Sequence, residues 1–142
     1  MKKHFLFLLF SLVIASFLCM SAGISQSVAQ DKNHGVGPIK SVKLDPTFDK
    51  KMVAEGKGIF NDKCVLCHEL DQLKIGPPLR NIAKDRAPEY IMNLLLNTAG
   101  MQKDDPSVRA LIKKYNNIVM INPELNEAKA RSVLEYLRSV AK

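Results

Sequence analysis

The chain has 142 residues, with 21 basic and 14 acidic side chains and a formal net charge of +7 at pH 7. This length suits one domain with one hydrophobic core. The positive charge is moderate and spread along the chain, without the dense Lys/Arg runs of a nucleic-acid-binding arm, so we expect no nucleic-acid partner.

The first 29 residues have the pattern of a secretory signal peptide. A basic start precedes an almost wholly apolar run over residues 5–20, and Ser27-Val28-Ala29 places small residues at the −3 and −1 positions of a cleavage site. The apolar run is shorter than the roughly 20 residues that span a bilayer, so we expect cleavage rather than a membrane anchor. The mature protein is then expected in the periplasm, with no stable membrane insertion.

Two elements are predicted between this leader and the pair of cysteines at positions 64 and 67. Residues 30–45 contain Gly35, Gly37, Pro38 and several lysines without a clear period, which predicts a flexible arm leading to a domain over residues 46–142. Apolar residues then recur at helical spacing between Phe48 and Phe60. A first helix is therefore expected to start near Pro46-Thr47 and to run into the motif that follows.

That motif is Cys64-Val65-Leu66-Cys67-His68, a C-x-x-C-H sequence. Two thiols at this spacing can each bond to one vinyl-derived carbon of the same porphyrin edge, and the next residue can place an imidazole nitrogen on the iron. The alternatives are a disulfide, a redox C-x-x-C pair, which should lie in a βαβ unit, or half of a zinc site. A zinc site needs a second Cys or His pair, and Cys19, His4 and His34 form none near the motif. The motif predicts one covalent c-type haem, bound by Cys64 and Cys67, with His68 as an iron ligand.

Three further helices are predicted after a loop that Gly76-Pro77-Pro78 marks. One opens at Ala87-Pro88-Glu89 and is expected to end at Gly100. A short one is capped by Asp105-Pro106, and a final one over residues 127–140 has Asn126 as its N-cap, with residues 116–125 as a loop between them. The domain is therefore predicted to be all-α, with about four helices and long loops wrapped around one haem.

A second iron ligand is expected if the haem carries electrons, and the thioether of Met is a common choice. Met52 and Met92 lie on predicted helix faces and are better explained as core residues. Met101 and Met120 both lie in predicted loops. Met120 comes just before the final helix, and the residues alone leave both candidates open.

Several short elements follow one another over about residues 46–140. They are Gly56-Lys57-Gly58-Ile59-Phe60, the C-x-x-C-H motif, Gly76-Pro77-Pro78-Leu79, a loop Met and Tyr136-Leu137. This order resembles the monohaem class I cytochrome c family. The resemblance implies the fold of that family and a close crossing of Gly56 and Phe60 with the final helix near Val133 and Tyr136.

The resemblance also implies roles at the haem. Pro77 would offer its carbonyl to Nδ1 of His68, and Met120 would bind the iron opposite His68. Many family members have Pro beside the ligand Met, whereas Val119 and Ile121 flank Met120 here.

These ligands predict an electron carrier and not an enzyme, because protein side chains fill both axial positions. Redox proteins are the expected partners, and a basic rim suited to acidic docking surfaces is predicted from Lys57, Lys63, Lys74, Lys113 and Lys114. One alternative is an open-site haem sensor or enzyme, for which His34 is the available distal acid or base outside the leader. Another is a haem subunit held in a respiratory complex by an uncut leader.

Overall fold

Six helices joined by loops make up residues 33–142, the part of the chain that this computed structural model describes. They are α2 (Lys50–Lys63), α3 (Ile82–Asp85), α4 (Pro88–Leu96), α5 (Thr98–Asp104), α6 (Pro106–Lys114) and α7 (Glu127–Val140). This part holds no β-strand, so the all-α prediction is confirmed. The expected signal peptide lies outside the described residues. Within them, no helix is long and apolar enough to cross a membrane.

Polar side chains fix where three of these helices begin. The Asp49 carboxylate accepts hydrogen bonds from the backbone N–H groups of Lys51 and Met52, at 2.8 and 3.0 Å, so α2 begins at Lys50 and not near Pro46. Buried Asp105 caps α6 in the same way. Asn126 caps α7 as predicted.

One predicted helix is two helices in the structure. The segment expected to run from Pro88 to Gly100 breaks at Asn97, whose backbone leaves the helical region (φ −134°, ψ 48°). The Asn97 side chain donates instead to the carbonyl of Val36, at 3.0 Å. Gly100 lies inside α5 rather than ending a helix, and Met101 follows it there. The expectation that Met101 lies in a loop is therefore wrong.

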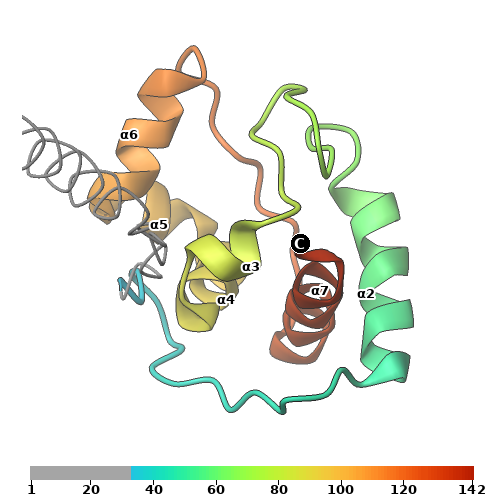
Figure 1. Cartoon of the computed structure of the whole chain (residues 1–142). Coiled ribbons are helices and arrows are strands. Elements are labelled where there is room, and N and C mark those ends of the chain that lie inside the picture. Colours follow the sequence, from blue (N-terminus) through green and yellow to red (C-terminus); the bar gives the residue numbers. More distant parts are fainter. Residues whose placement is uncertain (1–32) are drawn as a thin grey trace, which may run out of the picture.

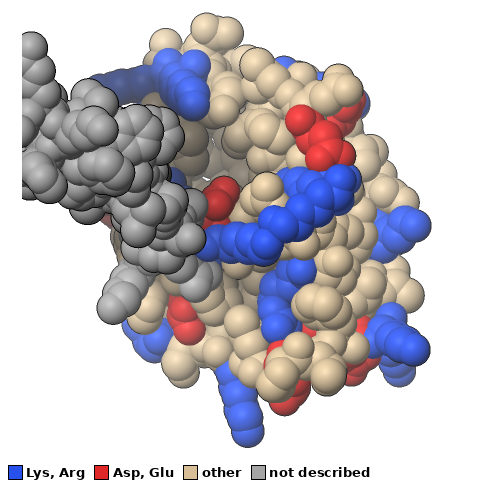
Figure 2. Space-filling model, viewed as in Figure 1, with Lys and Arg blue, Asp and Glu red and all other residues tan. Residues whose placement is uncertain are grey.

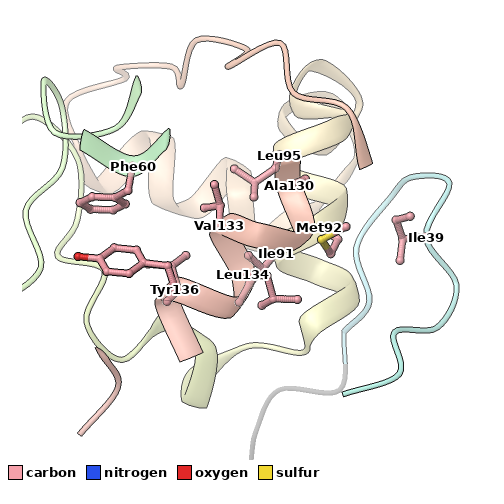
Figure 3. Packing of buried hydrophobic residues seen from close by; sticks show 10 residues of the cluster. Ile39, Phe60, Ile91, Met92, Leu95, Ala130, Val133, Leu134 and Tyr136 are labelled. Atoms are coloured by element: carbon pink, nitrogen blue, oxygen red, sulfur yellow. The ribbon is translucent and has the colours of Figure 1, made fainter. Parts of the chain in front are cut away.

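Helix α7 forms the centre of the fold, with α2 on one side and α4 on the other (Figure 1). The α2–α7 crossing brings Phe60 and Tyr136 together, with ring centroids 5.3 Å apart. Figure 3 shows α4 packing on the other face, where Ile91, Met92 and Leu95 meet Val133 and Leu134. The predicted crossing of the two helices at Gly56 and Phe60 is confirmed.

The segment 33–45, here called the N-terminal strap, is an extended stretch laid on α4 and α5 (Figure 1). The side-chain amide of Asn93 accepts from Ile39 N–H and donates to the carbonyls of Ile39 and His34, each at 2.9 Å. Glu89 accepts from Val42 N–H at 2.7 Å. The sequence predicts a flexible arm over residues 30–45; in the structure, these polar contacts join the strap to α4.

Candidate functional site

The C-x-x-C-H residues form a tight turn at the C-terminal end of α2. Cys64 is the C-cap of the helix, and its carbonyl accepts from Cys67 N–H and His68 N–H at 3.1 and 2.8 Å. The Cys67 carbonyl in turn accepts from the N–H groups of Ile75 and Gly76. These hydrogen bonds therefore fix the backbone that carries both thiols and the imidazole. The bonds to Ile75 and Gly76 also close the loop that follows the motif.

The His68 ring is fixed by the loop that follows it. Its Nδ1 lies 2.8 Å from the carbonyl oxygen of Pro77, the contact that the resemblance implied. A carbonyl only accepts, so Nδ1 carries the proton and Nε2 presents its lone pair. Nε2 has no hydrogen-bond partner among residues 33–142. This is the arrangement of a metal-binding histidine whose orientation is set by a carbonyl on its far nitrogen.

Gly76 makes room for this ring. A Cβ at that position would lie 2.4 Å from Cε1 of His68, closer than real side-chain contacts allow. The glycine of the Gly-Pro element is therefore required by the imidazole and not by its own backbone conformation.

Side chains brace the same loop from outside. Lys74 Nζ donates to the carbonyl of Val65 at 2.7 Å. Arg80 forms an ion pair with Asp71, and its hydrogen bonds hold the pKa of that carboxyl below the usual value. The Lys74–Val65 hydrogen bond and the Arg80–Asp71 ion pair thus hold the loop between the cysteine motif and α3 at two points.

Cys64 and Cys67 form no disulfide, so both sulfur atoms are available for thioether bonds. Burial, followed by the neighbouring Cys67, raises the pKa of the Cys64 thiol to about 11, although Lys63 acts in the opposite direction. Redox C-x-x-C pairs work through a thiol whose pKa is lowered, so this environment does not suit one. Residues 33–142 also contain no group of three His, Cys, Asp or Glu side chains that could hold a metal ion, which disfavours a zinc site.

The two candidate methionines have different surroundings. Met101 is fully buried in α5 among Ala87, Tyr90 and Val108, and its sulfur accepts a hydrogen bond from Val36 N–H at 3.0 Å. Met120 is half-buried in the loop before α7. The Met101 sulfur is thus hydrogen-bonded to the strap, whereas the Met120 side chain is partly exposed.

Large apolar side chains are exposed on two loops at the same end of the molecule (Figure 1). These loops are the one that follows the cysteines and the one that carries Met120. The exposed side chains on these loops are Leu73, Ile75, Ile118, Val119 and Ile121, and Leu66 is exposed within the cysteine motif itself. Two free thiols, an imidazole with a free Nε2 and an apolar rim together fit a covalently attached porphyrin.

The comparisons with known proteins agree with this site. The family model of cytochrome c matches residues 53–141. The chain belongs to the cytochrome c family. A solved cytochrome c from Rhodothermus marinus is 43% identical, with 74% of this chain and 90% of that chain covered and a TM-score of 0.71.

An engineered cytochrome c from the same organism has the same identity and coverage and a TM-score of 0.70. The engineered protein bound to a carbene intermediate (1-ethoxy-1-oxopropan-2-ylidene) gives a TM-score of 0.69. A search of curated proteins gave no match.

Membership of this family establishes two further points. The fold is that of a monohaem class I cytochrome c, and the chain binds one covalent c-type haem that supports electron transfer. The residues that fit this haem are Cys64 and Cys67 for the thioether bonds and His68 for the iron.

One contact near the site has no signal in the sequence. Gln102, in α5, donates from its side-chain amide to the carbonyl of Met120, at 2.6 Å. A glutamine in a helix has no recognisable motif, and the two residues are separated by 18 positions. The contact depends on the position of α5, a helix that the sequence pattern did not predict as a separate element.

Proposed function

We propose that this cytochrome c is a soluble single-electron carrier whose iron is bound by His68 and Met120. When bound, the haem takes up and releases one electron between its ferric and ferrous states. The observation that carries the proposal is the contrast between the two candidate methionines. Met101 is fully buried with its sulfur hydrogen-bonded to the strap, which leaves Met120 as the methionine in a loop.

The protein residues around the haem would act by orientation and by exclusion of water. The Pro77 carbonyl would keep His68 in the tautomer that presents Nε2, and this hydrogen bond raises the basicity of the ring. The apolar side chains of both loops would keep water from the iron, and a filled sixth position would keep small molecules off it. Such a site reorganises little on electron transfer, which suits a carrier.

The distal histidine that an open-site enzyme would need is placed elsewhere. His34 lies in the strap, with Nε2 3.9 Å from the Glu89 carboxylate, and its side chain is 55% exposed. Its position supports the carrier over the open-site alternative.

Export to the periplasm is part of the proposal, since the leader pattern precedes an intact C-x-x-C-H motif. The test is the N-terminus of the mature protein, determined by mass spectrometry. A start at Gln30 agrees with a free carrier, and an intact leader would support the tethered alternative.

The ligand proposal is tested with Met120→Ala and Met101→Ala in the purified holoprotein. Met120→Ala is expected to abolish the sulfur-to-ferric-iron absorption band, to lower the midpoint potential because a soft thioether favours ferrous iron, and to admit cyanide. Met101→Ala removes a buried side chain and is expected to lower the free energy of unfolding by about 2–5 kcal/mol while leaving the band in place. The reverse pattern would assign the ligand to Met101, and no spectral change in either variant would favour an open site.

A further inference from the structure

Over residues 118–125, the loop that carries Met120 has a single hydrogen bond to a sequence-distant part of the described chain. Within residues 118–125, two bonds are local, from Ile118 N–H to the Tyr115 carbonyl and from Glu124 N–H to the Asn122 side chain. The third joins the Met120 carbonyl to the Gln102 amide, at 2.6 Å. Among residues 33–142, Gln102 is therefore the one sequence-distant residue that is hydrogen-bonded to residues 118–125.

Apolar packing of this loop on the core is confined to Met120 and Leu125, which are both partly buried. Three of its apolar side chains are largely in solvent, with Ile118 49%, Val119 55% and Ile121 82% exposed. The backbone enters the loop through a left-handed conformation at Asn117 (φ 59°), which asparagine tolerates, and leaves it through one at Glu124 (φ 55°), where the conformation costs energy. The position of Met120 thus depends strongly on the few contacts that the loop does make.

Gln102 itself lies in a helix that packing and hydrogen bonding hold in place. The preceding residue, Met101, is fully buried and bonded to Val36 N–H, and α5 packs against both α4 and α6. The Gln102 amide therefore projects from a rigid element toward a loosely held one, which is the arrangement needed to position a neighbouring group.

We propose that Gln102 is a positioning residue for the iron ligand. By holding the carbonyl of Met120, it keeps the thioether of the same residue in place and lowers the fraction of molecules in which the sulfur has left the iron. This inference rests on the proposed role of Met120 as axial ligand.

The expected effect follows from the net strength of one hydrogen bond. Losing the Gln102 bond should raise the fraction of the Met-dissociated state about three- to tenfold. Imidazole added to the ferric protein binds only in that state, so its apparent dissociation constant should fall by the same factor.

The experiment is an imidazole titration of the ferric holoprotein in four variants. Gln102→Ala removes the donor, and Gln102→Glu keeps the shape but replaces the donor with a carboxylate that can only accept at neutral pH. Both should bind imidazole about three- to tenfold more tightly. Gln102→Lys keeps a donor on a chain of similar length and should stay near the parent value. Lys103→Ala, the matched control on the same helix, should also leave the affinity unchanged.

Two results would overturn the proposal. One is an unchanged imidazole affinity in both Gln102→Ala and Gln102→Glu; the other is an equal gain in Lys103→Ala or Gln102→Lys, which would indicate a general loosening of α5. If Gln102→Ala fails to fold, the comparison of Gln102→Glu with Gln102→Lys decides the question. Failure of the ligand proposal is separate, because it shows in the spectrum of Met120→Ala whatever the Gln102 variants do.

Discussion

Gly56 of α2 lies against the backbone carbonyl of Ser132 in α7. A Cβ at Gly56 would be 1.9 Å from the Ser132 oxygen and 2.5 Å from its carbonyl carbon. The obstruction is backbone and cannot rotate away, so the two helices can cross at this distance only because residue 56 has no side chain. The crossing places the C-terminal end of α2, and with it the C-x-x-C-H turn, over the core.

The first prediction compares two glycines of the same helix. Gly56→Ala should lower the free energy of unfolding by about 3 kcal/mol, because the helices must separate to admit the methyl group. A Cβ at Gly58 would meet no other atom within 4 Å, so Gly58→Ala should instead stabilise α2 by about 0.5–1 kcal/mol. Chemical denaturation of both holoproteins measures the difference. Equal effects in the two variants would show that the crossing tolerates a side chain.

The second prediction concerns the bond between the strap and α4. Asn93 uses its amide as both acceptor and donor toward Ile39, and it also donates to the His34 carbonyl. Asn93→Ala should cost about 1–3 kcal/mol, because it leaves buried backbone groups without partners. Asn93→Asp should cost more at neutral pH, since it directs a carboxylate oxygen at two carbonyls.

Limited proteolysis offers an independent measurement of the same contact. Cleavage within residues 33–45 should accelerate in both Asn93 variants, because proteases act where backbone opens locally. Lys40→Ala is the matched control, because its ammonium bonds only a nearby carbonyl in the strap. Strap cleavage at the parent rate in Asn93→Asp would contradict the assignment of Asn93 as its anchor.

The strap also marks the limit of what the sequence pattern indicates. The C-x-x-C-H turn and helix α7 were predictable because their determinants are local: two thiols and an imidazole within five residues, and Asn126 three residues before the N–H that it caps. The contact between Ile39 and Asn93 spans 54 positions, and nothing in a stretch of Gly, Pro and Lys indicates that a distant amide will hold it.

Met101 illustrates the same limit at the haem. In the sequence it is one of two loop methionines, because Gly100 suggests a helix end. In the structure Gly100 lies within α5, and the strap donates to the Met101 sulfur from 65 positions away. Local pattern singled out the cysteines and the histidine as candidates, while the surroundings of the two methionines and the contact of Gln102 with Met120 follow from packing.

The third prediction is a pH dependence that comes from Glu135 in α7. Burial alone would raise the pKa of this carboxyl, but hydrogen bonds and charges from Arg131 and Arg138 outweigh it and hold the pKa below its usual value. A pKa that is lower in the folded state contributes stability above the unfolded value of about 4.3. That contribution should be lost as pH falls through the folded pKa.

Glu135→Gln removes this contribution and leaves two arginines without their partner. It should lower the free energy of unfolding by about 3 kcal/mol at pH 7 and flatten the decline in stability below about pH 4. Glu127→Gln, an exposed first-turn change in the same helix, should cost only about 0.3–1 kcal/mol. Unfolding curves collected between acid and neutral pH measure both, and an unaltered acid decline in Glu135→Gln would rule out this origin.

The last prediction tests the basic rim of Lys57, Lys63, Lys74, Lys113 and Lys114, which the sequence predicts to suit acidic docking surfaces. Figure 2 shows Lys and Arg side chains spread over this face of the molecule rather than gathered in one patch. Two of the five rim lysines have partners within the protein: Lys74 bonds the Val65 carbonyl, and Lys114 lies 5.5 Å from the centre of the Tyr115 ring. Lys57, Lys63 and Lys113 are therefore the rim positions best suited to charge reversal.

Reversing these three charges to Glu should slow electron transfer to an acidic redox partner about tenfold at low salt, because it removes long-range attraction during encounter. Salt should slow the parent protein toward the rate of the triple variant, since exposed charges are screened beyond about 10 Å at 0.1 M ionic strength. Lys43→Glu changes the net charge on the strap and should have a small effect, because most of the strap runs along the end of the molecule away from the loop that follows the cysteines and the loop that carries Met120 (Figure 1). Stopped-flow rates across a salt series make the comparison. A parent rate that does not respond to salt would contradict a role of the basic rim in docking. Apolar contact around the haem edge would then determine how the partner docks.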